Sequence, residues 1–189
     1  YTLDGATKLR DKLATWPGGR MVIDIVEMPI KCPVAPLEFA FLADAFFTDR
    51  GMRDKVQITY VTPLDNAFTK PAASAELAHL LAEKRIDLVT EFSAGRVDGE
   101  KGVLSSWDER EVPFDLLVAV PVHMGAEFVS RSPGLGDEMA FVPTDPRTLQ
   151  SKAAPNVFAI GDATNLAVSK AGSVAHFEAE ILTENIKRF

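Results

Sequence analysis

The sequence of 189 residues contains one cysteine and three histidines that lie far apart. A single cysteine cannot form an internal disulfide, and the sequence has no group of cysteines and histidines with the spacing of a zinc site. Its apolar runs are also much shorter than the roughly 20 residues that a membrane-spanning helix requires. We therefore expect no metal site and no membrane span in this stretch.

Positive charge is scarce as well. Lysine and arginine number 20 against 27 aspartates and glutamates, which gives a formal net charge of −7. A protein that binds a nucleic-acid backbone needs the opposite balance, so we expect no nucleic-acid partner. Apolar residues are plentiful at 47%, enough to form the core of one or two small domains.

Both ends of the sequence suggest a piece of a longer protein. It begins at Tyr1 rather than at methionine, and Arg188 and Phe189 end it inside a pattern typical of an amphipathic helix. We expect such a piece to hold only part of any functional site. The expected location is the cytoplasm, with or without peripheral contact to a membrane.

Short apolar runs alternate with helical patterns along the first half of the chain. A first helix is expected over residues 3–13; strands are then predicted at 21–26, 56–61 and 87–91, and helices at 37–48 and 74–85. Strands and helices that alternate in this way are typical of a right-handed parallel α/β unit, so we predict a Rossmann-like sheet. An antiparallel meander attached to this sheet is predicted over 92–112, and a central strand over 114–120.

Beyond Pro121 the sequence becomes rich in glycine and proline, as in the run from Pro133 to Gly136. Such composition is typical of irregular connections. We therefore predict a domain boundary near residue 122, which divides the chain into domains 1–122 and 123–189.

The most informative motif lies in the second domain. A turn containing Thr148 leads to a predicted apolar strand at 157–160, which ends in Gly161 and Asp162. Glycine lets a ligand approach the backbone, and a carboxylate at the carboxyl end of a strand can accept hydrogen bonds from a chain of sugar-like hydroxyls. This is typical of a flavin-binding aspartate, although a bare Gly-Asp pair would more often be an ordinary turn.

The Rossmann-like unit lacks the glycines that a dinucleotide site requires. If its first crossover helix begins near Leu37, the three positions of a G-x-G-x-x-G motif fall on Lys31, Pro33 and Pro36. The two prolines also remove N–H groups that would bind a pyrophosphate. The second strand ends in Thr62 and Pro63, where an acidic residue for a ribose is common. The sequence predicts the fold without a nicotinamide site.

Cys32 stands in this altered loop. Lys31 precedes it and a helix is predicted shortly after it, and both features favour a thiolate, so a reactive sulfur is one interpretation. The alternative is a buried cysteine that acts as a small hydrophobe. His123 follows the apolar run at 114–120 and is interpreted as a structural histidine; His79 and His176 are interpreted as residues outside any site.

Together these stretches resemble a flavoprotein superfamily. The Gly161-Asp162 motif and its apolar strand are similar to the distal FAD motif of the pyridine nucleotide-disulfide oxidoreductases, and the resemblance extends over the whole chain. Two further segments, 31–36 (KCPVAP) and 169–173 (SKAGS), resemble the branch of sulfide:quinone oxidoreductase and flavocytochrome c sulfide dehydrogenase. Ser169 stands where that branch usually has proline.

The resemblance implies a Rossmann-like parallel sheet with an antiparallel meander, plus the distal part of an FAD-binding domain. It implies FAD as cofactor, Cys32 as catalytic residue, and sulfide and a quinone or other electron acceptor as partners. The cofactor-binding residues it implies are Gly161, Asp162, Lys170, Ala171 and Gly172. It also implies partner cysteines and a peripheral membrane contact in regions outside this chain.

Two alternatives remain open. One is an NAD(P)H-dependent reductase of the same superfamily, which the absent glycines disfavour. The other is a non-catalytic interaction domain derived from this fold.

Overall fold

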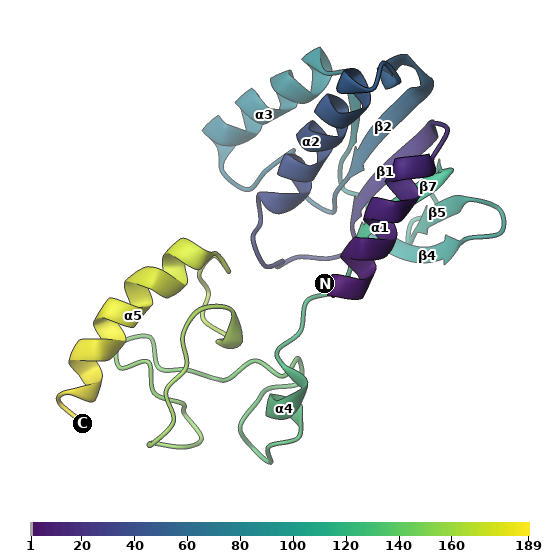
Figure 1. Cartoon of the computed structure of the whole chain (residues 1–189). Coiled ribbons are helices and arrows are strands. Elements are labelled where there is room, and N and C mark those ends of the chain that lie inside the picture. Colours follow the sequence, from purple (N-terminus) through teal and green to yellow (C-terminus); the bar gives the residue numbers. More distant parts are fainter. Residues whose placement is uncertain (1) are drawn as a thin grey trace. The chain divides into compact units, whose positions relative to one another are not determined.

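The computed structural model describes residues 2–189, which form two compact units (Figure 1). The N-terminal unit comprises the described residues up to Met28 together with Val34–Val122. The C-terminal unit comprises His123–Phe189 and also the short segment Pro29–Pro33. Pro29–Pro33 is therefore part of the C-terminal unit, although the residues on both sides of it in the sequence belong to the N-terminal unit.

A four-stranded parallel sheet forms the centre of the N-terminal unit. Its order is β3-β2-β1-β7, with β1 Gly19–Ile25, β2 Val56–Val61, β3 Ile86–Val89 and β7 Leu116–Val120. All three pairings in it are parallel. The residues of β1 from Met21 to Ile25 are buried, as expected for a strand covered on both faces. The predicted α/β fold class is confirmed.

Three helices belong to this unit: α1 Leu3–Thr15, α2 Ala35–Asp49 and α3 Pro71–Glu83, with a short 3-10 helix η1 at Arg53–Lys55. Figure 1 shows α2 and α3 on the same side of the sheet. Proline lies in the first turn of α2 and of α3, where no intrahelical N–H bond is lost. Phe47 and Leu37 of α2 are fully buried, which places its apolar side in the core.

The predicted meander is present and antiparallel, with β4 Ala94–Asp98, β5 Val103–Ser106 and β6 Glu111–Pro113. It forms a three-stranded sheet of its own and adds no strand to the parallel one. Val22 and Val61 of the parallel sheet pack with Phe92 and Leu104 in one buried cluster, so side-chain packing connects the two sheets.

The prediction of a central strand over 114–120 was wrong in one respect. The strand forms as β7, but it pairs only with β1 and lies at the edge of the sheet. Most of its residues are half-buried and Ala119 is exposed. A short apolar run does not distinguish a central strand from an edge strand, because both need at least one apolar face.

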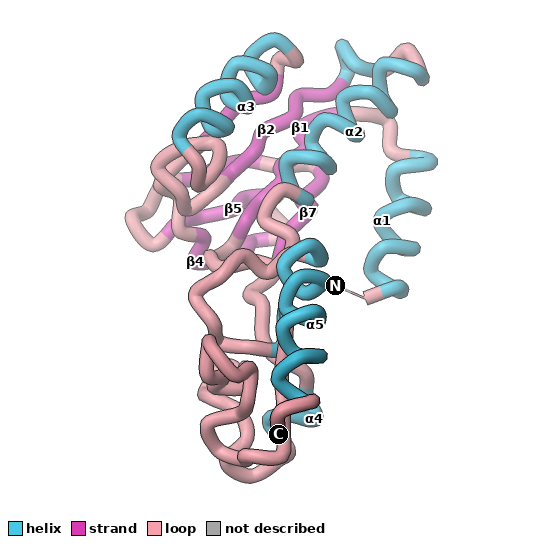
Figure 2. The backbone as a smooth tube through the Cα atoms, turned by 90° about the vertical axis from the view of Figure 1, so that its left-hand side faces the viewer, coloured by secondary structure: helices cyan, strands magenta, loops and turns pink. Residues whose placement is uncertain are grey.

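The C-terminal unit consists mostly of loops, as Figure 2 shows. Its helices are α4 Glu127–Ser130, the 3-10 helix η2 Gly161–Ala163 and α5 Gly172–Ile186. The strand predicted at 157–160 is not formed: among the described residues, Phe158 makes a single antiparallel bridge to Gln150. A strand requires a continuous ladder of backbone partners, which the nearby chain does not supply.

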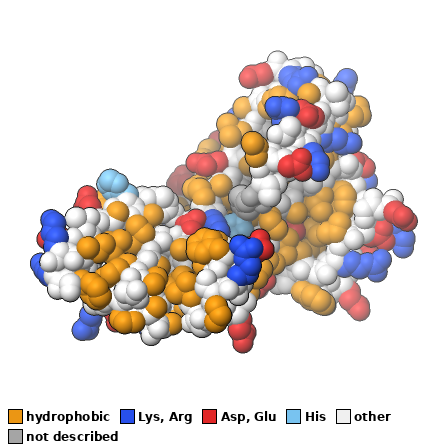
Figure 3. Space-filling model, turned by 60° about the horizontal axis from the view of Figure 1, so that its bottom comes forward, with side chains coloured by type: hydrophobic (Ala, Val, Ile, Leu, Met, Phe, Trp, Pro, Cys, Tyr) orange, Lys and Arg blue, Asp and Glu red, His pale blue; other side chains and the backbone are white. Residues whose placement is uncertain are grey.

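Apolar side chains also lie on the surface of the molecule (Figure 3). On α5, Phe177 is 62% exposed and Ile181, one turn further, is 52% exposed. None of the described helices is both long and apolar enough to cross a membrane.

Candidate functional site

The loop that carries Cys32 is bonded to the segment that precedes α5. The Cys32 N–H donates to the Lys170 carbonyl at 2.6 Å, and Lys31 and Lys170 form a parallel bridge. All these residues belong to the C-terminal unit. The Cys32 side chain is exposed, which makes its thiol accessible. Two of the segments that the sequence singled out, 31–36 and 169–173, therefore meet through their backbones.

His123 contacts the same loop. Its Nδ1 accepts the Lys31 N–H, so the amides of two successive residues are both held by the C-terminal unit. The ring is buried, with 6% of the residue exposed. Burial lowers the pKa of His123, and the positive charge of Lys31 lowers it further. The imidazole is therefore neutral at neutral pH.

Lys170 is a buried cation held from two sides. Its Nζ donates to the Thr164 carbonyl at 2.7 Å and lies 4.2 Å from the centre of the Phe141 ring. Burial lowers the pKa of Lys170, and the charge of Asp162 opposes this effect. The side chain thus holds the 161–164 turn and the segment before α5 together.

Gly161 takes a conformation that few other residues could adopt. Its φ is +60°, and a Cβ at this position would lie 2.9 Å from the Cβ of Ala175 on α5. Its N–H donates to Glu178 Oε2 at 2.5 Å, and its carbonyl accepts from the Thr164 hydroxyl at 3.0 Å. These contacts bring η2, with the half-buried Asp162, against α5.

Replacing Glu178 by Ala is expected to lower the free energy of unfolding of the C-terminal unit by about 1–3 kcal/mol, because it leaves the buried Gly161 N–H unpaired. Glu178→Gln keeps an acceptor oxygen and should recover most of the loss. The matched control is Glu180→Ala, since Glu180 is exposed on the same helix. Urea unfolding would measure all three, and equal losses for residues 178 and 180 would contradict the role of the hydrogen bond.

The N-terminus of α5 lacks a side-chain cap. Ala171 is its N-cap residue and makes no side-chain hydrogen bond to the first turn, and the space beside Gly172 is open. The first N–H groups of a helix have no partner within it and carry partial positive charge. This end of a 15-residue helix can therefore receive an electronegative group.

The structure brings the predicted site residues into one unit and adds His123 and Glu178 to them. The sequence predicts only a structural role for His123 and predicts no role for Glu178. Glu178 is a charged residue on the buried side of a helix, but no motif marks it. Neither contact could be foreseen, because their partners lie 92 and 17 residues away in the sequence. In the described residues, no group of acidic, histidine and cysteine side chains could hold a metal ion.

The fold is similar to that of part of solved flavoprotein oxidoreductase structures. A solved structure, the sulfide:quinone oxidoreductase of Aquifex aeolicus, matches 97% of this chain with a TM-score of 0.72 and 22% identity. The match covers 48% of that structure's chain. No known family profile matches the chain.

Curated relatives are similar over nearly the whole chain. The mitochondrial sulfide:quinone oxidoreductase of Mus musculus is 28% identical over 188 residues, and that of Schizosaccharomyces pombe is 29% identical over 167 residues. The matches cover 96% and 85% of this chain, but only 42% and 36% of those proteins. The resemblance to the sulfide:quinone oxidoreductase branch is confirmed, and the chain spans less than half the length of these relatives.

Proposed function

We propose that this chain is part of an FAD-dependent oxidoreductase that oxidises sulfide and passes the electrons to a quinone or another acceptor. The observation that carries this proposal is the bond between the Cys32 loop and Lys170, which joins the candidate redox residue to the segment that begins α5. The N-terminal unit is then a nucleotide-binding-like domain without its nicotinamide site. The C-terminal unit is the distal segment of the FAD-binding domain.

The residues of the C-terminal unit fit a flavin. The uncapped N-terminus of α5 offers N–H groups and positive potential to an electronegative part of the ring system, with open space beside Gly172. Asp162 lies in η2, next to Gly161 and its contacts, and would accept hydrogen bonds from the ribityl hydroxyls. Lys170 and Ala171 position this helix end. FAD, when bound, supplies a two-electron acceptor.

Cys32 would accept the sulfur. A thiolate and HS⁻ form the S–S bond of a persulfide with release of one proton and two electrons, and the electrons require the flavin as acceptor. The exposed thiol beside Lys31 suits attraction of an anionic substrate. Pro33 and Pro36 follow it and have no N–H to offer a pyrophosphate, which supports sulfide rather than a pyridine nucleotide as reductant.

Replacing Cys32 by Ser in the intact protein is expected to slow sulfide-dependent bleaching of the flavin by roughly 10²-fold or more, because a hydroxyl is a far weaker nucleophile than a thiolate. Stopped-flow absorbance would measure the rate, and the visible spectrum before mixing would report that flavin is still bound. The matched control is Val34→Ser, which adds a hydroxyl to the same loop and keeps the thiol.

Bleaching at an unchanged rate in Cys32→Ser would remove this residue from the mechanism. Rapid bleaching by NADH alone would contradict the proposed reductant and favour the reductase alternative. An intact protein without any flavin would favour the non-catalytic alternative.

A further inference from the structure

Cys32 has a backbone conformation that its own side chain disfavours. Its φ is +50°, in the left-handed region, where a residue with a Cβ is strained. Such a conformation persists only where the surrounding structure holds it. Two hydrogen bonds do so here: the Lys31 N–H donates to His123 Nδ1, and the Cys32 N–H donates to the Lys170 carbonyl.

We propose that His123 is a positioning residue for Cys32: its neutral imidazole accepts the Lys31 N–H, holds the thiol-bearing residue in the left-handed conformation, and releases it when the ring is protonated. The proposal rests on the function proposed above only in taking Cys32 as the redox residue. The hydrogen bond itself, and its loss in acid, do not depend on the reaction.

The two hydrogen-bond acceptors respond differently to pH. The Lys170 carbonyl accepts the Cys32 N–H at every pH, whereas His123 Nδ1 accepts the Lys31 N–H only while it carries no proton. Because the Lys31 N–H occupies Nδ1, the neutral ring carries its proton on Nε2. Of these two hydrogen bonds, only the one from Lys31 to His123 is therefore broken when the pH falls.

The charges around the ring set the direction of this switch. Lys31 from the cysteine loop and Lys170 before α5 both disfavour a second positive charge on His123, and Asp162 of η2 opposes them. Together with burial they place the pKa of His123 below its ordinary value of 6.5. The contact is thus complete at neutral pH. It is lost as the pH falls through this lowered pKa.

Protonation of His123 also changes the stability of the fold. Below pH 6.5 an unfolded chain takes up a proton on this histidine before the folded one does, so stability falls with falling pH until the folded ring is also protonated. Release of the loop and loss of stability in acid therefore have a common cause.

The direct test is an NMR titration of the 189-residue chain between about pH 5 and about pH 8. The Lys31 amide shift is expected to follow the protonation of the His123 ring with the same midpoint. His123→Asn offers a carbonyl acceptor that does not titrate, so the shift should become flat. His176→Asn is the matched control, because His176 is exposed on α5, and it should leave the Lys31 profile unchanged.

Hydrogen exchange tests the positioning itself. In His123→Leu, which has no acceptor, the Lys31 amide should exchange at least about tenfold faster than in the wild type at neutral pH, and His123→Asn should restore most of the protection. If the leucine variant fails to fold, the wild-type titration and the asparagine variant still decide. A Lys31 shift that stays constant while the ring titrates would overturn the proposal.

In the intact protein, the rate of sulfide-dependent flavin reduction is measured as a function of pH. This rate should decline at acid pH with the same midpoint as the protonation of His123, and the decline should be absent in His123→Asn. Failure of the proposed function is distinguishable: undiminished reduction in Cys32→Ser would exclude the redox role but leave the Lys31 titration intact. A decline that persists unchanged in His123→Asn would refute the positioning role in catalysis.

Discussion

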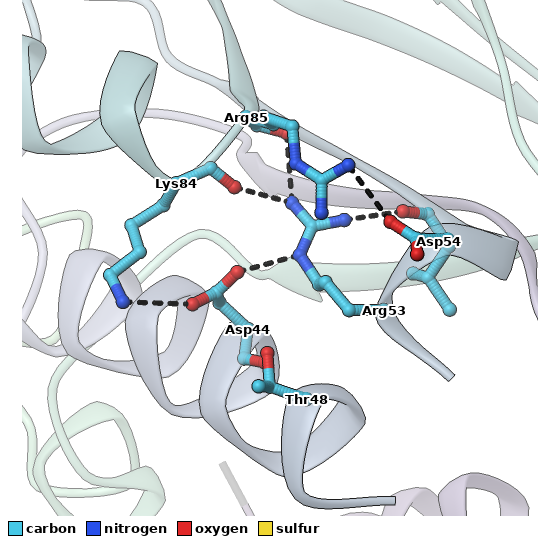
Figure 4. A network of polar contacts seen from close by, with 7 residues as sticks. Asp44, Thr48, Arg53, Asp54, Lys84 and Arg85 are labelled. Carbon is cyan, nitrogen blue, oxygen red and sulfur yellow. Dashed lines mark hydrogen bonds and ion pairs between the residues drawn. The ribbon is translucent and has the colours of Figure 1, made fainter. Parts of the chain in front are cut away.

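Replacing Arg53 by Ala is expected to lower the free energy of unfolding of the N-terminal unit by about 3–5 kcal/mol, because the change leaves a buried charge without its partner. Arg53 lies in η1 and its Nε donates to Asp44 Oδ1 of α2 at 2.6 Å. Both side chains are nearly buried, with 10% and 7% exposed. Figure 4 shows this arrangement.

The Arg53 guanidinium also donates hydrogen bonds to three backbone carbonyls. Nη1 donates to Val56 at 2.5 Å, and Nη2 donates to Lys84 at 2.6 Å and to Arg85 at 2.9 Å. These carbonyls lie at the start of β2 and just after α3, so a single side chain joins α2, β2 and the end of α3. Lys84 Nζ lies 3.3 Å from Asp44 but is half exposed, and it replaces only part of the lost charge.

Urea unfolding would measure the effect, with Asp54→Asn as the control. Asp54 accepts from Arg85 at 2.9 Å next to the buried pair, but the two side chains are 88% and 66% exposed. An exposed ion pair contributes about 0–1 kcal/mol, so the control should unfold close to the wild type. Equal destabilisation by the two substitutions would contradict the central role of Arg53.

Replacing Asp24 by Val is expected to stabilise the N-terminal unit by a few kcal/mol at neutral pH. Asp24 lies in the middle of the sheet, opposite Val61 of β2 and Ala119 of β7, and is 0% exposed. Neither of its carboxylate oxygens has a hydrogen-bond partner among the described residues. Burial raises the pKa of Asp24 to about 7. Valine suits a strand and removes the buried carboxylate.

The stabilisation should depend on pH in a defined direction. Because the folded pKa lies above the unfolded value of 3.8, the unfolded chain ionises first as the pH rises, and stability falls from its full value below 3.8 until the pH reaches about 7. Over this range the advantage of Asp24→Val should grow by about 4 kcal/mol, from 1.36 kcal/mol for each unit of pKa.

Asp87→Val is the matched control, because Asp87 is an exposed aspartate on β3 of the same sheet. Its effect should stay small and independent of pH, within about 0.5–1 kcal/mol for a surface site. Urea unfolding of the three proteins at about pH 4 and about pH 8 would decide. A gain for Asp24→Val that is the same at both pH values would show that the carboxyl group is not the cause.

The sequence predicted most elements of the N-terminal unit, since each depends on local patterns. Alternating apolar strands and helices located β1 to β3, α2 and α3, and glycine turns located the meander. The edge position of β7 and the separate sheet of the meander could not be predicted in this way. Both depend on which backbone pairs with which, and this is a choice between distant segments.

In the C-terminal unit, too, the sequence predicted local motifs but not the contacts between distant residues. The motifs around Cys32, Gly161 and Lys170 are visible in the sequence, and their roles toward sulfide and flavin stay predictions. The apolar run at 157–160 suggested a strand, but within the described chain it lacks a ladder of partners. His123 carried no signal beyond its place after an apolar run.

Composition and local pattern alone determined that this is an acidic α/β chain with a glycine-free cysteine loop and a Gly-Asp motif before its last helix. Only the tertiary structure decided that Pro29–Pro33 joins the C-terminal unit, where His123 and Lys170 hold the backbone of Lys31 and Cys32. The reason is physical: helix and strand periodicity arise from neighbours in sequence, whereas these contacts join residues about ninety or more positions apart.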